Sequence, residues 1–376
     1  MTERLPVLLD VDTGIDDGLA LLYACASPEA EILAVTCVAG NVDARQVAEN
    51  TRAVLELAGR EDVEVALGRE VPLARNLVTT PETHGPRGIG YAELPPARRA
   101  LSSRHAVDLL IDEIRNRPGE VTLVTLGPLT DVALAVLREP ALPRLLRRLV
   151  IMGGSYRSPG NTAPTSEWNV HVDPEAARIV FLAFGAPDVV RAREAAGLPG
   201  RPMALGLDVT ERAKLTPGHL ERLAARAGCR PDGSIASAGS GASGEAASNA
   251  AAASASPCEP DAFDPIVRFL ADALRFYMEF HSRYDGFYGA FIHDPLALAA
   301  ALDPSLVRTE ALPVDVELGG TLTTGETVTD WRRVWGRPPN VDVAVEADAT
   351  LFMDRFIERV GAYAAARRTA PPRIGR

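Results

Sequence analysis

The segment Leu9–Leu19, LDVDTGIDDGL, carries aspartates at positions 10, 12, 16 and 17. An apolar run, Leu5–Leu9, precedes it, and a helical pattern of apolar residues begins at Leu19. The acids therefore lie where a buried strand is predicted to pass into a helix. Asp10 and Asp12 face the same side of that strand, and carboxylates at positions 16 and 17 suit the exposed N–H groups of the first helical turn.

Four carboxylates in so short a segment repel each other and resist burial. A bound hard cation would offset this repulsion, and clusters of oxygen ligands suit Ca²⁺ or Mg²⁺. A solvated acidic turn with one N-cap aspartate is the simpler alternative. The second pair of acids, at the predicted start of the helix, favours the cation site.

Composition narrows the class of protein. The chain has 376 residues, and an apolar fraction of 47% is typical of a globular core. A net charge of −11 without a basic tract argues against nucleic-acid or anionic-membrane partners. The sequence has no 18-residue apolar run, and its start lacks the pattern of a signal peptide. We therefore expect a cytoplasmic protein.

Strand-like and helix-like segments alternate through the first half of the chain. After the first strand, the predicted strands are Glu31–Ala39, Val63–Leu67, Val121–Leu126, Arg148–Met152 and Met203–Val209. Repeated units of this kind predict an α/β fold with a mainly parallel, doubly wound sheet. Three later segments predict a small antiparallel addition: Val314–Leu318, Thr327–Trp331 and Val341–Val345.

The chain is predicted to form a single catalytic domain over residues 1–365. Residues 228–259 consist mostly of Ala, Ser and Gly, and this composition predicts a disordered insertion. Residues 366–376 are predicted to be a flexible tail. The segment Arg75–Pro96 is rich in turn residues and predicts a long loop, a feature that often acts as a functional lid.

Several motifs follow the predicted strands. Ligands of such sheets bind beyond the carboxyl ends of the strands, so these motifs are expected at one edge. In chain order they are DVDTGIDD (10–17), AGN (39–41), TLGPLTD (125–131), IMGG (151–154), GN (160–161), EWN (167–169) and HDP (293–295). The set closely resembles the inosine–uridine type nucleoside hydrolases, over residues 5–365. The resemblance implies the nucleoside hydrolase fold and a homodimer or homotetramer that hydrolyses the N-glycosidic bond of small-molecule ribonucleosides.

The resemblance also implies one Ca²⁺, which holds the attacking water and the 2′- and 3′-hydroxyls of the ribose. By motif position, its protein ligands would be Asp12, Asp17, Asp294 and the main-chain carbonyl of Leu126. Asp12 would also take the proton of the water as general base. Asp10 would orient the loop or a ligand from behind.

The remaining motif residues would contact the substrate. Those expected to bind the ribose hydroxyls are Asp16, Asn41, Asn161, Glu167 and Asn169. Met152 would pack against the sugar, with Trp168 at a nearby aromatic position. His293 would be the acid or the orienting group at the nucleobase. His84 would approach the base when the long loop closes, with a surface histidine as the equal alternative.

The preference for a purine or a pyrimidine stays open in the sequence. The helix predicted over Phe263–Tyr284 lies near the place where the family binds its base. Polar and aromatic side chains in this helix and just after it recur at helical spacing, which also fits a stripe of core residues: Tyr277, His281, Tyr284 and Tyr288.

Two other functions compete with the hydrolase. A haloacid-dehalogenase-type phosphatase would use Asp10 as a phosphorylated nucleophile with Mg²⁺. That family needs a downstream basic residue, and the single lysine, Lys214, has no supporting motif. A non-catalytic Ca²⁺-dependent nucleoside- or ribose-binding protein would keep the same acids. The presence of both Asp12 and His293 favours the enzyme.

Overall fold

The computed structural model describes residues 4–229 and 264–369 and contains an eight-stranded sheet. Its strands are β1 (Leu5–Val11), β2 (Ala30–Cys37), β3 (Glu64–Leu67), β4 (Thr122–Thr125), β5 (Arg148–Met152), β6 (Met203–Leu205), β9 (Val307–Leu312) and β12 (Val341–Ala347). Their order is β3-β2-β1-β4-β5-β6-β12-β9. Neighbours from β3 to β12 pair in parallel, and β9 pairs antiparallel to β12 at one edge. The predicted α/β architecture is confirmed.

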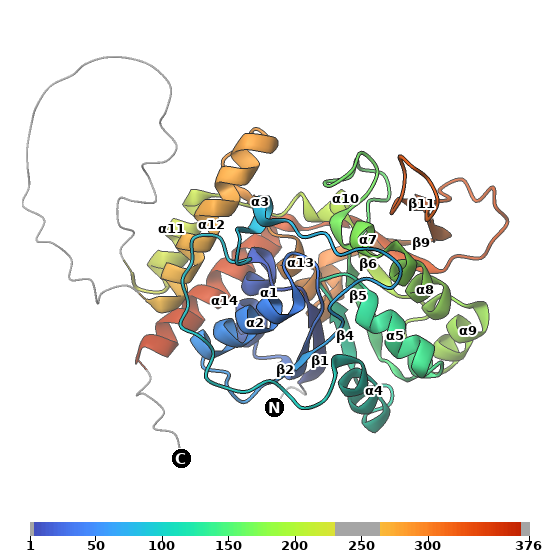
Figure 1. Cartoon of the computed structure of the whole chain (residues 1–376), viewed down its shortest axis with the longest axis horizontal. Helices are drawn as coiled ribbons and strands as arrows, with labels where there is room; N and C mark the ends of the chain where they lie inside the picture. The colour runs from blue at the N-terminus through green and yellow to red at the C-terminus, as the bar shows by residue number, and fades with distance from the viewer. Residues whose placement is uncertain (1–3, 230–263, 370–376) are drawn as a thin grey trace, which may run out of the picture.

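Helices cover both faces of the sheet (Figure 1). One face carries α1 (Ile15–Ala26), α2 (Ala44–Leu57), α11 (Pro217–Arg226), α12 (Pro265–Tyr284), α13 (His293–Leu302) and α14 (Ala349–Thr369). The other carries α4 (Ala106–Asn116), α5 (Thr130–Arg138), α6 (Leu142–Leu145), α8 (Pro174–Phe184) and the outlying α9 (Pro187–Ala195). Along β1, Leu9 packs into the first layer and Leu8 into the second. This alternation explains why the first strand is apolar on both sides.

The strand order reverses beside β1. The chain moves from β1 outward to β2 and β3, then returns to β4 on the other side of β1 and continues outward to β5 and β6. Loops that leave β1 and β4 therefore diverge, and a crevice forms where ligands of doubly wound sheets bind. Asp12 follows β1 and Leu126 follows β4, so the reversal brings these two motifs together.

Two strand predictions need correction, and one strand of the main sheet was not predicted. The expected strand Met203–Val209 stops at Leu205, and α10 (Leu207–Thr210) follows it. Gly206 turns the chain where it passes close to the neighbouring loop, because a Cβ at this position would meet the carbonyl oxygen of Gly154 at 2.6 Å. The expected antiparallel segment Val341–Val345 belongs to the main sheet as β12, and its antiparallel partner β9 was not predicted.

The small ladders lie outside the main sheet. β10 (Val314–Val316) pairs antiparallel with β11 (Thr327–Thr329), as predicted. A second ladder joins β7 (Lys214–Leu215) to β8 (Ala290–Phe291). Three short helices also lie outside the sheet: α3 (Pro81–His84) within the predicted loop Arg75–Pro96, α7 (Trp168–Val172) and η3 (Pro304–Leu306).

Little of the predicted insertion belongs to the described residues. Apart from residues 228 and 229, the predicted insertion 228–259 lies outside the described residues. The prediction of a flexible tail over 366–376 needs correction, because α14 extends to Thr369. None of the helices within residues 4–229 and 264–369 combines the length and apolar character needed to cross a membrane.

Candidate active site

A cavity of about 470 Å³ opens at the carboxyl edge of the sheet. This volume lies in the range of small-molecule sites. Most of the predicted site residues line it: Asp16, Asn41, His84, Leu126, Met152, Asn161, Glu167, Trp168, Asn169, His293 and Asp294. Asp10, Asp12 and Asp17 are buried and do not line this cavity. The structure therefore gathers motifs that lie far apart in the sequence.

Asp17 is fixed at the start of α1. Its carboxylate accepts backbone N–H groups from Gly14 at 2.9 Å and Asp12 at 3.2 Å. The side-chain amide of Asn41 approaches the same carboxylate at 3.3 Å. Burial raises the pKa of Asp17, and these backbone donors oppose the rise because they favour the charged form at the helix N-terminus.

Asp12 has one occupied and one free carboxylate oxygen. Oδ2 accepts the N–H of Asn41 at 2.8 Å, whereas Oδ1 is buried and has no partner among the described residues. Glycines allow two neighbouring strand-end loops to approach this carboxylate. A Cβ at Gly40 would lie 2.1 Å from Oδ2, and one at Gly127 would lie 2.9 Å from Oδ1. The glycines of the AGN and TLGPLTD motifs are thus required by the packing around Asp12.

Asp16, Asp17 and Asp294 form a buried acidic cluster. One carboxylate oxygen from each lies within 4.8 Å of the others. Burial, followed by repulsion from neighbouring acids, raises the pKa of Asp16 and Asp294 well above the usual value. Burial and then Asp17 do the same to the pKa of Asp12. These carboxyls cannot all ionise together without a positive charge nearby.

The cluster differs in one member from the predicted ligand set. Asp17 and Asp294 belong to both, whereas the cluster includes Asp16 in place of Asp12. The carbonyl oxygen of Leu126 accepts the side-chain amide of Asn169 at 2.6 Å. A carbonyl oxygen has two lone pairs, so this hydrogen bond leaves one free.

Asp10 lies behind the cluster. Its Oδ1 accepts the hydroxyl of Thr36 at 2.6 Å, and its Oδ2 is buried without a partner among the described residues. Burial and then the nearby Asp131 raise its pKa well above the usual value. The charged groups that act on Asp10 are the acids Asp131 and Asp17, and no lysine or arginine lines the cavity in the described part of the chain. A phosphate would therefore find no basic partner here, which argues against the nucleophilic role that a phosphatase would require.

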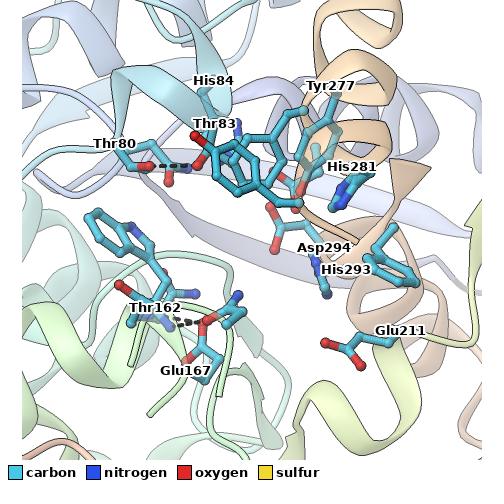
Figure 2. Close-up of a pocket in the computed structure, with 18 of the residues that line it drawn as sticks. Thr80, Thr83, His84, Thr162, Glu167, Glu211, Tyr277, His281, His293 and Asp294 are labelled. Atoms are coloured by element: carbon cyan, nitrogen blue, oxygen red, sulfur yellow. Dashed lines mark hydrogen bonds between the residues drawn. The ribbon is translucent and has the colours of Figure 1, made fainter. Parts of the chain in front are cut away.

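The loop after β5 supplies a second group of polar side chains. Glu167 caps α7 and accepts N–H groups from Gly154 at 2.8 Å and Asn169 at 2.8 Å. The side-chain oxygen of Asn161 accepts the N–H of Trp168 at 3.0 Å. Figure 2 shows Glu167 and Thr162 on one side of the cavity. These contacts hold the predicted sugar-binding residues on a rigid loop.

In each of the two predicted site histidines, His84 and His293, one ring nitrogen makes a hydrogen bond. Nδ1 of His84 accepts the N–H of Ile15 at 3.1 Å, so its Nε2 carries the hydrogen. Nδ1 of His293 lies 2.8 Å from the hydroxyl of Thr210, which also reaches the carbonyl of Gly206 at 3.2 Å. Burial lowers the pKa of each histidine to about 3, so both are neutral at pH 7. His84 is buried at the cavity, which excludes the alternative of a surface histidine.

Side chains of α12 form one wall of the cavity, a role that the sequence alone left open. Tyr277, His281 and Tyr284 line the cavity, but Tyr288 does not. The stripe is therefore partly a cavity wall and partly core. Sequence reasoning missed other lining residues, among them Glu211, Asp285 and Phe291. The wrong strand assignment over 203–209 hid Glu211, which follows α10 and not the end of a strand.

Comparisons with known proteins agree with this geometry. A family model described as inosine-uridine preferring nucleoside hydrolase matches residues 7–354. An inosine-uridine preferring nucleoside hydrolase of Leishmania major is 36% identical over 362 residues, covering 94% of this chain and 98% of the relative. A pyrimidine-specific ribonucleoside hydrolase (RihA) of Citrobacter koseri is 35% identical over 361 residues, covering 96% and 99%.

Solved structures support the same assignment. The purine-preferring ribonucleoside hydrolase from Gardnerella vaginalis superposes with a TM-score of 0.79 at 28% identity, covering 96% of this chain and 99% of that chain. Two relatives thus carry opposite base preferences in their names, so the family alone does not assign the base. The match over nearly the whole chain nevertheless shows that this protein belongs to the inosine-uridine preferring nucleoside hydrolase family and is an enzyme that hydrolyses N-glycosyl compounds.

Proposed function

We propose that this enzyme hydrolyses ribonucleosides to free base and ribose with Ca²⁺ as its cofactor. The observation that carries the proposal is the buried cluster of Asp16, Asp17 and Asp294 at a cavity of about 470 Å³. Its acids repel each other, and no lysine or arginine lies among the lining residues in the described part of the chain. A divalent cation and a ribosyl ring that becomes positive would both offset this repulsion.

The donor set fits a hard cation. All candidate ligands are oxygens: the carboxylates of Asp12, Asp17 and Asp294 and the carbonyl of Leu126, with Asp16 beside them. The unpartnered Oδ1 of Asp12 is one such buried oxygen. Calcium prefers six to eight oxygen ligands, and two ribose hydroxyls and a water would extend the protein set. When bound, Ca²⁺ would lower the pKa of the attacking water and fix the ribose hydroxyls.

Asp12 is the proposed general base. The N–H of Asn41 and the surrounding glycines hold its carboxylate in place. Oδ1 has two lone pairs and no protein partner in the described chain, so one can contact the cation and the other can accept a proton from water. As the bond to the base breaks, positive charge develops on the ribosyl ring. The carboxylates of Asp16 and Glu167, which line the cavity, would stabilise that charge.

Ribose recognition is assigned to the polar wall of the cavity. Asp16, Asn41, Asn161, Glu167 and Asn169 would hydrogen-bond the sugar hydroxyls. Met152 and Trp168 would pack against the sugar. A sugar that lacks a hydroxyl would leave buried polar groups unpaired, which costs far more than a lost apolar contact.

His293 is proposed to orient the leaving base. The Thr210 hydroxyl has one hydrogen, and when it donates to Gly206 it must accept from Nδ1 of His293. Nε2 of His293 then presents a lone pair. This arrangement favours an orienting role over an acid in the ligand-free enzyme. His84, whose Nε2 carries a hydrogen, would donate to an acceptor on the base.

The wider biological setting follows from the family. We propose a cytoplasmic homodimer or homotetramer whose partner is a small ribonucleoside, with no nucleic acid or membrane partner. The absence of a basic tract and the net charge of −11 support this choice of substrate over a polynucleotide.

Release of ribose tests the activity. The full-length protein is incubated with inosine, uridine and p-nitrophenyl riboside, and free reducing sugar is measured. The proposal expects ribose from at least one nucleoside. Binding of a nucleoside without release of ribose would favour the non-catalytic binding protein. Release of phosphate from phosphate esters instead would favour the phosphatase.

A further inference from the structure

His281 and Asp285 form a hydrogen-bonded pair at the end of α12. Nδ1 of His281 lies 2.7 Å from a carboxylate oxygen of Asp285, one helical turn further along the chain. The histidine side chain is 5% exposed, whereas that of Asp285 is 42% exposed. Both residues line the cavity. A buried imidazole is therefore held from the solvent side by a carboxylate.

The carboxylate fixes which nitrogen carries the hydrogen. An ionised carboxylate only accepts, so Nδ1 of His281 must donate to Asp285. Nε2 of the neutral ring is then a bare acceptor, and this atom is buried without a hydrogen-bond partner among the described residues. The ring cannot swing away easily, because its centroid lies 4.6 Å from that of Tyr277 and 4.8 Å from that of Phe291.

Glu211 adds a second acceptor at the same end. Its carboxylate lines the cavity and makes no hydrogen bond or ion pair with any residue that the structure describes. Burial and then the charge of Asp285 raise its pKa, which indicates that the two acids share one region of the cavity. In the view of Figure 2, His281 and Glu211 lie opposite Thr162 and Glu167, with Asp294 between the two sides.

His281 and Glu211 lie at the end of the cavity where the base is expected to bind. Under the proposed function, the ribose binds at Asp294 and the loop that carries Glu167, so the base extends toward α12. There it meets acceptors: Nε2 of His281 and the carboxylate of Glu211. An exocyclic amino group offers two N–H donors, whereas a carbonyl oxygen at the same position offers none and faces lone pairs.

We propose that His281, positioned by Asp285, acts with Glu211 to select ribonucleosides whose base carries an exocyclic amino group. Cytidine is preferred over uridine, and adenosine over inosine. This inference rests on the proposed function and deepens it. Each pair exchanges an amino group for a carbonyl and, with it, a bare ring nitrogen for a ring N–H, so each tests within one size of base whether the acceptors face the exocyclic position.

The experiment compares specificity constants of the full-length enzyme with Ca²⁺. kcat/KM is measured for cytidine, uridine, adenosine and inosine. We expect the amino member to be preferred by about tenfold or more in at least the better-hydrolysed pair, since losing a hydrogen bond to a buried acceptor commonly costs that much. Equal constants within both pairs, or a preference for uridine and inosine, would overturn the inference.

Variants separate this role from a structural one. In Asp285→Ala, Nδ1 of His281 loses its carboxylate acceptor, so the hydrogen is no longer held on Nδ1 and can move to Nε2, where it converts the acceptor into a donor. The amino preference should shrink toward one or reverse, and Glu211→Gln should also reduce it. The matched control is Glu310→Gln, because Glu310 is also 42% exposed and pairs with Arg308 away from the cavity; its preference should equal that of the wild type. An unchanged preference in Asp285→Ala would contradict the positioning role.

Failure of the inference is distinguishable from failure of the proposed function. If all four nucleosides release ribose at similar rates, the enzyme is a nucleoside hydrolase and only the selection by His281 and Glu211 is wrong. If none of the four, nor p-nitrophenyl riboside, releases ribose, the proposed function itself fails and the inference fails with it.

Discussion

At the scale of the single residue, the two carboxylate oxygens of Asp12 differ in their contacts. The N–H of Asn41 holds one carboxylate oxygen, and the other has no protein partner within the described chain. Asp12→Asn keeps an acceptor for Asn41 but removes the base and its negative charge. We expect kcat to fall by about 100-fold or more, while the melting temperature does not fall. Steady-state kinetics and thermal unfolding check this, and near-normal turnover would mean that another group is the base.

Asp131 offers a prediction about pH. Its carboxylate accepts the N–H of Arg69 at 2.9 Å, its other oxygen is buried without a partner in the described chain, and burial raises its pKa to about 7. The folded state therefore binds a proton that the unfolded state releases near pH 4. This contribution to stability is present at acidic pH and falls as pH rises from about 4 to about 7.

Asp131→Asn removes that loss of stability, because the amide stays neutral and can donate toward Asp10. The melting temperature of the variant minus that of the wild type should be larger at pH 8 than at pH 5, by about 2 °C or more. Calorimetry at fixed Ca²⁺ concentration measures both differences. A pH-independent difference would show that Asp131 is ionised throughout this range.

Site residues were predictable from the sequence where they follow the carboxyl end of a predicted strand. Asp16, Asn41 and Glu167 were predicted to share an edge because parallel strands end there, and all three line the cavity. Glu211 and Asp285 could not be found in this way. One follows a helix mistaken for a strand, and the other ends a long helix whose acids are usually solvated.

At the scale of elements, the loop that carries His84 is held against α12 by a glycine. Gly90 has a φ of +60°, and a Cβ there would meet Cβ of Phe276 at 2.8 Å and the carbonyl of Ala273 at 2.9 Å. Gly90→Ala should therefore lower stability by about 1–3 kcal/mol. It should also raise KM, because the displaced loop moves His84.

Gly119→Ala is the matched control. Gly119 also has a positive φ, of +80°, but a Cβ there meets nothing within 4 Å. Only the conformational cost applies, about 1 kcal/mol. Thermal unfolding and KM of both variants isolate the packing effect. If the two variants behave alike, contact between the loop and α12 contributes little to the site.

Apolar periodicity predicted where strands and helices lie in the sequence, but it did not predict which strands pair. β5 was predicted with its observed ends, and the alternation of strands and helices predicted the parallel sheet. β12 was placed in the wrong sheet because its partners, β6 and β9, are set by long-range register. Gly206 and the close approach of Gly154 ended β6, and such tertiary contacts are invisible in a local pattern.

At the scale of the whole molecule, the enzyme is predicted to be a homodimer or homotetramer. This expectation comes from the family, and light scattering coupled to size exclusion would measure the mass directly. The chain has a mass of 40.0 kDa, so a particle of two or four times that mass is expected. A single species with the mass of one chain would contradict the prediction.

The active site itself belongs to the whole molecule. The segments that contribute Asp16, Leu126 and Asp294 are far apart in sequence, and the reversal of strand order beside β1 brings the first two together. Family motifs predicted this convergence. They did not predict the wall from α12, because helical spacing alone cannot distinguish a core stripe from residues that line a cavity.

Ribonucleoside hydrolysis by this enzyme is expected to depend on a cation held by the buried acids. The most direct measurement is ribose release by enzyme stripped with EDTA, before and after Ca²⁺ is added back, with Asp294→Asn measured in parallel. Stripped enzyme should be inactive, Ca²⁺ should restore turnover, and the variant should require a higher Ca²⁺ concentration or stay inactive. Full activity of the stripped enzyme, with no response to Ca²⁺, would contradict the account.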